Sequence, residues 1–261
     1  MKTPLPKFPH ALHTGTTVQN RSLERGIEIL RSFRPGSDLL GNGELAERTG
    51  LSRSTVSRLT QTLVSAGILE HDKNARAYRL GAPVLCFAHA MRSCYPILQV
   101  ASPLMRSVAE TLQVNVGLAT ADRDEMVYLE SVRYNRKVSL RSVVAGQRVP
   151  IELTSLGHAY LAATSEGERR DLIAMFGAKR KCWQQLEQQI LQSIESVRTS
   201  EFCAVSWQPE VVALSTPIVL DNCPVYVLNA SVTTPEPIES VAARLAAPLL
   251  TLKRNIVAGM E

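Results

Sequence analysis

Apolar residues recur at helical spacing in two neighbouring segments between residues 42 and 67. In the first segment Leu45 and Ala46 provide an apolar side, and Gly50 at its end suits a left-handed helix terminus. The second segment has apolar residues at i, i+3 and i+7, which predict one buried stripe: Val56, Leu59 and Leu63. Ser52 precedes this stripe, where its hydroxyl can cap the helix. The pattern predicts two helices joined by a tight turn.

The other side of the second helix carries polar residues at i, i+3, i+4 and i+7: Ser54, Ser57, Arg58 and Gln61. This face is short-chained, hydrogen-bonding and basic, and it holds no acid, so it can enter a DNA major groove without clash or repulsion. Arg58 suits guanine edges or phosphate, and Gln61 and the serines suit bases or backbone. The alternative interpretation is the polar face that any helical hairpin presents to water.

The residues that follow favour the first interpretation. Residues 68–71 and 77–80 predict two short strands, and residues 72–76 form a polar turn between them. A helix-turn-helix followed at once by a hairpin is a winged helix, whose tip would place Lys73 and Arg76 against phosphate or the minor groove. The predicted DNA-binding residues are therefore Ser52, Arg53, Ser54, Thr55, Ser57, Arg58, Gln61, Lys73 and Arg76.

Helical periodicity also flanks this winged helix. A first helix over residues 21–34 is predicted by a stripe at i, i+4 and i+7: Leu23, Ile27 and Leu30. A helix over residues 84–94, ended by Tyr95-Pro96, has one apolar side: Leu85, Ala88 and Met91. We interpret this second helix as a connector between domains. It either buries its stripe against a second copy of itself or caps one of the two domains.

From residue 114 onward, β-rich runs alternate with helical segments. The predicted strands cover residues 114–121, 126–132, 138–144, 202–206, 211–219 and 225–232. After a helix that ends at about residue 112, further helices are predicted over residues 154–163, 167–176, 182–198 and 237–257. Strands, then helices, then strands and a closing helix are typical of an α+β domain, in which helices cover an antiparallel sheet.

Charge is distributed unevenly along the 261 residues, a length that predicts one or two domains. The overall composition, 45% hydrophobic and 20% charged, is ordinary for a globular protein. Residues 1–80 hold 12 Lys+Arg against 7 Asp+Glu, whereas residues 81–261 hold 17 of each. The whole formal excess of +5 therefore lies in the part with the winged helix, as expected when one domain meets a polyanion.

The cysteines are scattered, odd in number and without a CxxC pair: Cys86, Cys94, Cys182, Cys203 and Cys223. This usage predicts reduced thiols in a cytoplasmic protein, and for Cys86 and Cys94 core packing rather than redox sensing. No early apolar run is long enough to predict a signal peptide or a membrane span. The prolines and histidines of residues 1–20 predict a disordered tail.

Seven short motifs, taken in order, resemble the IclR-type family of bacterial transcriptional regulators. Residues 21–30, 44–51, 54–59 and 78–81 resemble the family's winged helix, and residues 127–130, 146–150 and 154–159 resemble its second domain. The resemblance implies a winged helix at residues 21–80 that binds double-stranded operator DNA, and a linker helix at residues 81–97. It implies a GAF-like domain at residues 98–261 that binds a small-molecule effector. It also implies a homodimer or a dimer of dimers that represses or activates a catabolic operon.

The family's effector contacts map, by the same resemblance, to Leu156, Gly157, Ala213, Asn229 and Ser231. Where many members carry an acidic run, this chain has Ser206 and Trp207.

Physical chemistry is compatible with such a site. Free N–H groups near Gly157, at a helix start, suit an anionic oxygen, and Trp207 offers a flat apolar wall. We therefore expect an organic acid or aromatic effector. The alternatives are a core aromatic at Trp207 and backbone-bonded strand residues at Asn229 and Ser231.

Two other classes of function compete with a ligand-responsive regulator. An enzyme is disfavoured because the sequence has no nucleophile elbow, zinc-ligand set or phosphate loop, and Ser155 with His158 is a coincidence of helical spacing. No metal or cofactor is expected. The second alternative is an architectural DNA-binding protein that needs no effector.

Overall fold

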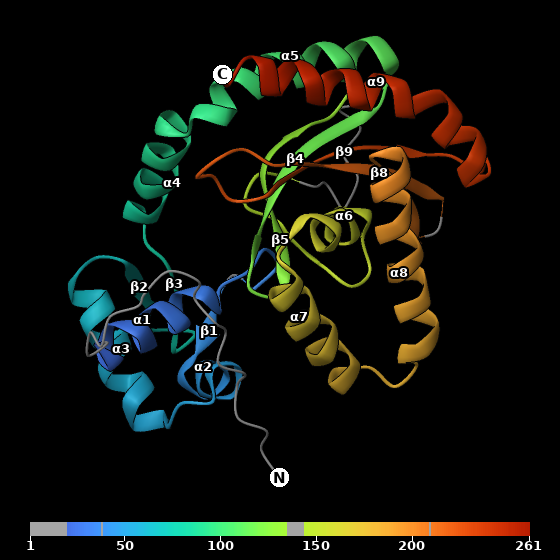
Figure 1. Cartoon of the computed structure of the whole chain (residues 1–261). Helices are drawn as coiled ribbons and strands as arrows, with labels where there is room; N and C mark the ends of the chain where they lie inside the picture. Colours follow the sequence, from blue (N-terminus) through green and yellow to red (C-terminus); the bar gives the residue numbers. More distant parts are fainter. Residues whose placement is uncertain (1–19, 38, 135–143, 209) are drawn as a thin grey trace. The chain divides into compact units, whose positions relative to one another are not determined.

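The computed structural model describes residues 20–37, 39–134, 144–208 and 210–261 (Figure 1). Nearly all of the predicted tail (residues 1–19) and of the predicted strand at 138–144 lies outside these ranges. The chain divides into two units, Met1–Cys94 and Tyr95–Glu261. Within the described residues, no helix is long and apolar enough to cross a membrane.

The N-terminal unit contains the predicted winged helix. Its elements are α1 (Arg21–Arg31), β1 (Leu40–Gly41), α2 (Asn42–Thr49), α3 (Arg53–Ser65), β2 (Leu69–Asp72), β3 (Ala77–Leu80) and α4 (Pro83–Cys94). The described strands form a small antiparallel sheet in the order β1-β3-β2. A small core joins helices and sheet: Ile29, Leu40, Leu45, Val56, Leu69 and Tyr78. The two-residue strand β1 was not predicted.

Local chemistry fixes the turn between α2 and α3. Gly50 has φ of +69°, a left-handed conformation that glycine adopts without the clash of a Cβ atom. Ser52 then caps α3, because its hydroxyl accepts a hydrogen bond from the Thr55 N–H at 3.3 Å. Val56 is fully buried on α3, with Leu59 and Leu63 packed beside it. Both the turn and the stripe confirm the pattern in the sequence.

One expectation for this unit is wrong, and one predicted helix has an exposed apolar stripe. Helix α1 is present as predicted, but Leu23 is 65% and Ile27 43% exposed, and the residue that α1 buries is Ile29. Cys86 and Cys94 do not pack in a core, because both are exposed and α4 buries none of its residues. In each case apolar residues recur on a helix face that no described residue of this unit covers.

The C-terminal unit is a sheet with helices on both sides. Its helices are α5 (Pro96–Leu112), α6 (Ser155–Ala163), α7 (Glu166–Lys179), α8 (Trp183–Ser200) and α9 (Ile238–Ala258). Its strands are β4 (Asn115–Asp122), β5 (Glu125–Val132), β6 (Arg148–Pro150), β7 (Cys203–Gln208), β8 (Val211–Ile218) and β9 (Tyr226–Thr233). The described strands are antiparallel in the order β6-β5-β4-β9-β8-β7. The predicted α+β class is confirmed, and among the described strands of this unit only the three-residue β6 was not predicted.

The two faces of this sheet are covered differently. Helices α5 and α9 lie side by side over one face, and α6 with α7 and α8 lies on the other (Figure 1). Side chains of alternate strand residues point to opposite faces, so Leu118, Leu214 and Leu228 pack toward α5 and α9. On the α6 face the same strands carry smaller and more polar residues, among them Gly117, Ser215 and Asn229.

Candidate functional site

The predicted DNA-contacting residues of α3 divide into an exposed set and a capping set. Arg53, Ser54, Arg58 and Gln61 are exposed, and Ser57 is half-buried. Ser52 accepts from the Thr55 N–H, and its hydroxyl also lies 2.9 Å from the Thr55 hydroxyl and 3.1 Å from that of Ser54. These three hydroxyls therefore order the start of α3, while the longer side chains further along the helix remain available.

Ion pairing distinguishes two kinds of arginine in this unit. Arg48 pairs with Glu44 at 2.7 Å, and Arg79 pairs with Glu70 at 3.2 Å. In contrast, the cations of the predicted DNA surface form no ion pair with any described residue: Arg53, Arg58, Lys73 and Arg76. An unpaired exposed cation can neutralise a phosphate without first losing a protein partner.

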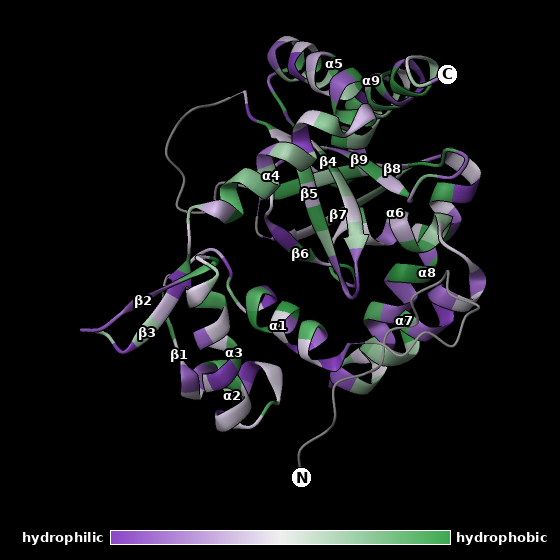
Figure 2. Ribbon diagram, turned by 90° about the vertical axis from the view of Figure 1, so that its left-hand side faces the viewer, coloured by the Kyte–Doolittle hydropathy of each residue, from purple (hydrophilic) through white to green (hydrophobic). Residues whose placement is uncertain are grey.

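The wing is a short hairpin whose turn is held by Asp72. Its carboxylate accepts hydrogen bonds from the N–H groups of Asn74 and Ala75, at 3.0 and 2.9 Å. These bonds, the one from Ala75 first, hold the pKa of Asp72 below its ordinary value, and Arg79 contributes in the same direction. Figure 2 shows the hairpin of β2 and β3 as hydrophilic toward its tip, where Lys73 and Arg76 are exposed.

We expect that Lys73→Ala and Arg76→Ala each weaken DNA binding by a similar factor for all DNA sequences. The reason is that phosphate contacts carry no base information but release condensed counterions. The slope of log K against log salt should fall by about 1 for each lost phosphate contact. Fluorescence anisotropy across a salt series measures this slope. Lys181→Ala, an exposed lysine of the other unit, is the control, and equal slopes in all four proteins would contradict the assignment.

The predicted effector residues on the strands occupy two neighbouring rows of the α6 face. The first row runs across four strands: Gly117, Asn229, Ser215 and Cys203. The second row lies one pleat away: Asn115, Ser231, Ala213 and Val205. The structure therefore brings together Ala213, Asn229 and Ser231, which are separated in the sequence. Asn115 and Ser215 were not predicted, because the sequence does not specify strand register.

Helix α6 begins over the first row. The Ser215 hydroxyl donates to the Ser155 hydroxyl at 2.8 Å, and the Cys203 thiol donates to the Ser155 carbonyl at 3.4 Å. Leu156 is buried in the cluster between α6 and the sheet. The positive end of the α6 dipole consequently faces the polar rows of β8 and β9.

The expectation for Gly157 requires correction. Its N–H is not free, because it donates to the side chain of Thr154, which caps α6 at 3.2 Å. The first four N–H groups of a helix lack a partner within the helix, and Thr154 takes those of Gly157 and His158, so Ser155 and Leu156 provide the donors instead. Gly157 has a packing role, since a Cβ atom there would stand 2.0 Å from the Ile151 carbonyl oxygen.

Ser206 and Trp207 lie on an irregular part of β7. The register of β7 on β8 shifts between Val205 and Gln208, so the two residues between them have no cross-strand partner. Ser206 is exposed and donates to the Gln208 carbonyl at 3.3 Å. Trp207 is 37% exposed and belongs to neither buried cluster, so the core-aromatic alternative is wrong. Its role as a pocket wall stays a prediction.

His158 does not pair with Ser155. Its Nδ1 lies 2.9 Å from the Ser193 hydroxyl and its Nε2 lies 3.1 Å from the Glu152 carbonyl oxygen. The side chain is 1% exposed, and burial lowers the pKa of His158 below its ordinary value. His158 therefore ties α6 to α8 and to the segment before α6, as a structural rather than a catalytic residue.

A buried neutral histidine makes stability depend on pH. Because its pKa is lower in the folded than in the unfolded chain, the contribution of His158 is complete above the unfolded pKa of about 6.5 and is lost as the pH falls below it. We expect the melting temperature to fall on acidification below that value, with a shallower fall in His158→Gln. Thermal unfolding across pH 5 to 8 measures both, with His89→Gln on exposed α4 as control. Parallel curves for parent and His158→Gln would contradict this role.

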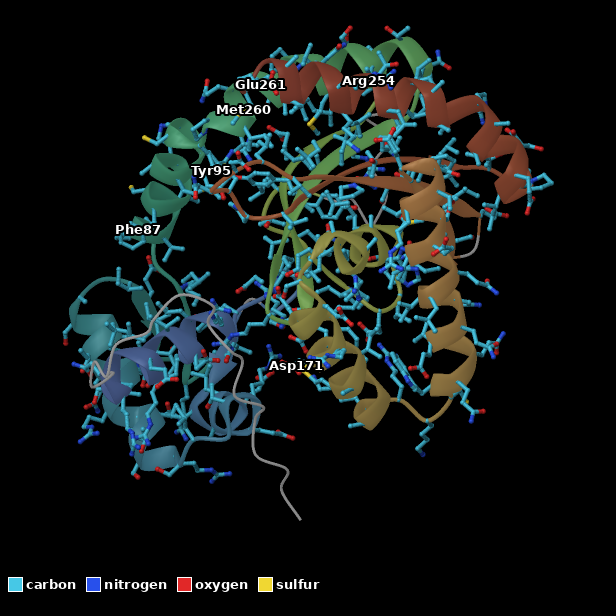
Figure 3. The ribbon with its side chains drawn as sticks, in the orientation of Figure 1. Phe87, Tyr95, Asp171, Arg254, Met260 and Glu261 are labelled. Atoms are coloured by element: carbon cyan, nitrogen blue, oxygen red, sulfur yellow. The ribbon has the colours of Figure 1, made fainter. Side chains whose placement is uncertain are left out.

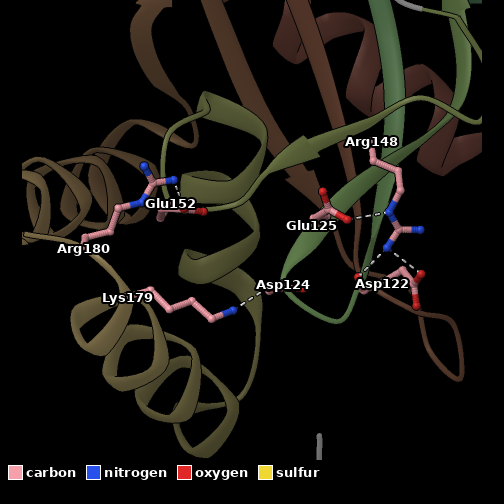
Figure 4. Close-up of polar contacts among 7 residues, drawn as sticks. All are labelled: Asp122, Asp124, Glu125, Arg148, Glu152, Lys179 and Arg180. Carbon is pink, nitrogen blue, oxygen red and sulfur yellow. Dashed lines mark hydrogen bonds and ion pairs between the residues drawn. The ribbon is translucent and has the colours of Figure 1, made fainter. Parts of the chain in front are cut away.

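Ion pairs hold the segment that leads into α6 (Figure 4). Arg148 on β6 pairs with Glu125 at 2.6 Å and with Asp122 at 2.7 Å, both at the β4–β5 hairpin. Glu152, just before α6, pairs with Arg180 at the end of α7. Lys179 pairs with Asp124 at 2.9 Å. The start of α6 is thus fixed from both the sheet and α7.

Comparison with known proteins identifies the family. A family model for the IclR helix-turn-helix domain matches residues 22–73. A second model, for the C-terminal domain of the bacterial transcriptional regulator IclR, matches residues 89–254, which is more than half of the chain. The chain belongs to the IclR family of bacterial transcriptional regulators. The resemblance found in its motifs is confirmed, and its named relatives in this family are regulators rather than enzymes.

Relatives of this IclR-family chain include three regulators of known name. It is 36% identical over 171 residues to the HTH-type transcriptional regulator TsaQ1/TsaQ2 of Comamonas testosteroni, a match that covers 64% of this chain and 60% of that regulator. It is 28% identical to the Pca regulon regulatory protein of Pseudomonas putida, over 76% and 68% of the two chains. It is 26% identical to the p-hydroxybenzoate hydroxylase transcriptional activator of Acinetobacter baylyi, over 76% and 75%.

Solved structures share the fold along nearly the whole chain. The crystal structure of an IclR-family regulator from Brucella abortus has a TM-score of 0.84 at 31% identity and covers 92% of this chain and 93% of its own. An IclR homolog from Microbacterium hydrocarbonoxydans, crystallised with 4-hydroxybenzoate, has a TM-score of 0.69 at 20% identity, with coverage of 92% and 98%. The second likeness concerns the fold alone.

Proposed function

We propose that this IclR-family chain is a ligand-responsive transcriptional regulator that binds double-stranded operator DNA through α3 and the wing. The observation that carries the proposal is the set of exposed, unpaired cations on α3 and at the hairpin tip: Arg53, Arg58, Lys73 and Arg76. The remaining predicted contacts, Ser52, Ser54, Thr55, Ser57 and Gln61, order the helix start or extend its polar face. The regulator acts as repressor or activator of a catabolic operon.

The effector in this proposal is a small organic acid or aromatic compound bound on the α6 face of the sheet. The N–H groups at the start of α6, among them that of Leu156, suit an anionic oxygen, and the strand residues on the same face are Ala213, Asn229 and Ser231. Regulators with names that refer to the Pca regulon and to p-hydroxybenzoate hydroxylase lend support, as does the Microbacterium homolog crystallised with 4-hydroxybenzoate. Ser206 and Trp207, at the open end of β7, remain candidates for contact with the ligand. We place the regulator in the cytoplasm, where exposed thiols stay reduced.

The active form in this proposal is a homodimer or a dimer of dimers. Helix α4 buries none of its residues and exposes large apolar side chains: Phe87 and Met91, which are one turn apart, and Leu85. Figure 3 shows Phe87 projecting from α4. A second copy of α4 is a suitable cover for Phe87 and Met91, and Leu23 and Ile27 on α1 are further exposed apolar residues of the same unit. Light scattering of the full chain should give at least twice the 28.6 kDa of one chain, and Phe87→Asp should shift it toward the monomer.

Ligand sensing is tested by thermal shift of the full chain against a panel of carboxylic acids. A bound effector stabilises the folded state by RT ln(1 + [L]/Kd), about 2.7 kcal/mol at a hundredfold excess over Kd. The regulator proposal expects at least one acid to raise the melting temperature and to change operator affinity. Operator binding that no acid alters would favour the architectural alternative.

A further inference from the structure

Two buried amide oxygens on the α6 face lack a hydrogen-bond partner among the described residues. They are Oδ1 of Asn115 and Oδ1 of Asn229, and Asn229 is only 4% exposed. Other buried polar groups nearby are satisfied, such as the hydroxyls of Ser155 and Ser215, which bond to each other. A buried acceptor without a donor is unfavourable in the free protein, so each such oxygen calls for a specific explanation.

The Asn229 side chain occupies space that a glycine leaves open. Gly117 on β4 pairs with Asn229 on β9, strands that are neighbours in the sheet (Figure 1). A Cβ atom on Gly117 would stand 2.4 Å from Asn229 Oδ1 and 2.4 Å from Cε1 of the Tyr128 ring. Strands β5, β4 and β9 are adjacent, and they thus bring the Tyr128 phenol and the Asn229 carboxamide together over the backbone of Gly117, which has no side chain.

The Tyr128 ring and the oxygen of this carboxamide share the space over Gly117. Tyr128 is itself buried, and burial raises the pKa of Tyr128 to about 12, so its hydroxyl stays protonated and neutral. The oxygen of Asn229 is the atom of the amide that is buried without a partner among the described residues.

Asn115 adds a second acceptor beside the first. Asn115 pairs with Ser231, two residues beyond Asn229 on β9, so the two asparagines are diagonal neighbours on one face of the sheet. Exposure increases along β9 in this direction, from buried Asn229 through half-buried Ser231 to exposed Thr233. The two acceptors therefore lie just inside the open end of the face.

The helix and the strands that border this region offer opposite hydrogen-bonding groups. Ser155 at the start of α6 bonds to Ser215, which is the cross-strand partner of Asn229, so the helix N-terminus and the asparagine oxygens flank the same rows. The helix start offers N–H donors, and the asparagines offer acceptors. A ligand that satisfies both sides carries an anionic acceptor and a separate donor.

We propose that Asn229, with Asn115 beside it, accepts a hydrogen bond from a hydroxyl group of the effector, whose carboxylate lies at the start of α6. The site then selects hydroxylated carboxylic acids over their unsubstituted and O-methylated analogues. This inference rests on the proposed effector sensing and adds the class of ligand. Discrimination of this kind is strong, because an analogue without the donor leaves a buried acceptor unpaired.

The same account predicts that the acceptor site lowers the stability of the free protein. Asn229→Leu alone would set an apolar side chain beside the buried phenol of Tyr128, so the informative variant is the double substitution Tyr128→Phe with Asn229→Leu. Replacing both partners of a buried pair by apolar groups of similar shape is nearly neutral or stabilising. We expect the double variant to melt at or above the temperature of the parent when no ligand is present.

A satisfied polar residue on the other face of the sheet supplies the control. Thr216 on β8 is fully buried and donates to the Glu201 carbonyl at 2.6 Å. Thr216→Val removes a bond that is made in the free protein, so this variant should melt below the parent. It should retain the parent's preference among ligands, because Thr216 does not face α6.

The experiment is calorimetry and thermal shift of the full chain with matched acids: benzoate, the three hydroxybenzoates and the three methoxybenzoates, with butanoate and 4-hydroxybutanoate as an aliphatic pair. We expect one hydroxy acid to bind at least tenfold more tightly than its unsubstituted or methoxy analogue. That preference should shrink to less than threefold in the double variant and persist in Thr216→Val.

Three results overturn the inference. If acids bind equally with and without a hydroxyl, sensing stands but the acceptor role is wrong. If the double variant keeps the hydroxyl preference, or melts clearly below the parent without ligand, Asn229 and Tyr128 are structural residues. If none of the acids binds, the proposed acid sensing fails, and the hydroxyl selectivity fails with it.

Discussion

Arg58→Ala should abolish specific operator binding while leaving the fold and the oligomer unchanged. Arg58 is exposed near the middle of α3 and pairs with none of the described acids, so its loss removes a DNA contact and no protein contact. A bidentate contact between arginine and guanine is worth about 1–3 kcal/mol per half-site, so a two-half-site operator should lose on the order of 2–6 kcal/mol.

A gel shift with operator and with unrelated DNA measures this loss. Specific binding should fall toward the level of unrelated DNA, because the remaining cations still contact phosphate. Arg198→Ala on α8, in the other unit, removes the same charge and should leave both affinities unchanged. An Arg58→Ala protein that retains the parent's operator affinity would exclude Arg58 from base recognition.

Gly157→Ala should destabilise the C-terminal unit strongly. A Cβ atom at this position would lie 2.0 Å from the carbonyl oxygen and 2.3 Å from the Cα atom of Ile151, and backbone atoms cannot rotate away as a side chain can. The segment before α6 would have to move, although Arg148, Glu152 and the Thr154 cap hold it in place. The expected loss is about 3 kcal/mol or more, at the upper end of overpacking effects.

Gly167→Ala is the matched control for that substitution. Gly167 lies on α7, and a Cβ atom there would meet nothing within 4 Å. Since alanine is favoured over glycine in a helix by about 0.5–1 kcal/mol, this variant should be slightly more stable than the parent. Chemical denaturation of the three proteins gives the comparison. Equal stability of Gly157→Ala and the parent would show that α6 can move away from Ile151.

The local sequence pattern was sufficient to predict most elements of the N-terminal unit. Gly50 and Ser52 determine the turn between α2 and α3 through their own backbone and hydroxyl chemistry, which sequence neighbours alone specify. The same pattern failed for Leu23 and Ile27, because helical periodicity marks an apolar face and does not say what covers it. Strands of two or three residues, such as β1 and β6, are too short to carry a period of their own.

The candidate effector site depends on contacts between residues far apart in the sequence. The N–H groups near Gly157 were interpreted as free for a ligand, whereas the Gly157 N–H donates to Thr154 and the neighbour that requires glycine is Ile151. The acceptor role of Asn229 depends on Gly117 and Tyr128, which reach it only through the pairing of β9 with β4 and β5 with β4. Buried His158 likewise finds its partner on α8, 35 residues away. Composition and residue spacing do not specify which distant residues meet in the fold, so they could not predict these contacts.

The central claim is that this chain is a DNA-binding regulator that responds to a small acid. It is tested most directly by affinity selection of fragmented DNA from the genome that encodes it, with the purified full chain, in the presence and absence of the acid that raises its melting temperature most. We predict enrichment of a few short sites with two-fold symmetric half-sites, and a change of at least fivefold in their occupancy when the acid is added. Uniform recovery of DNA without a shared site, or occupancy that no acid changes, would contradict the account.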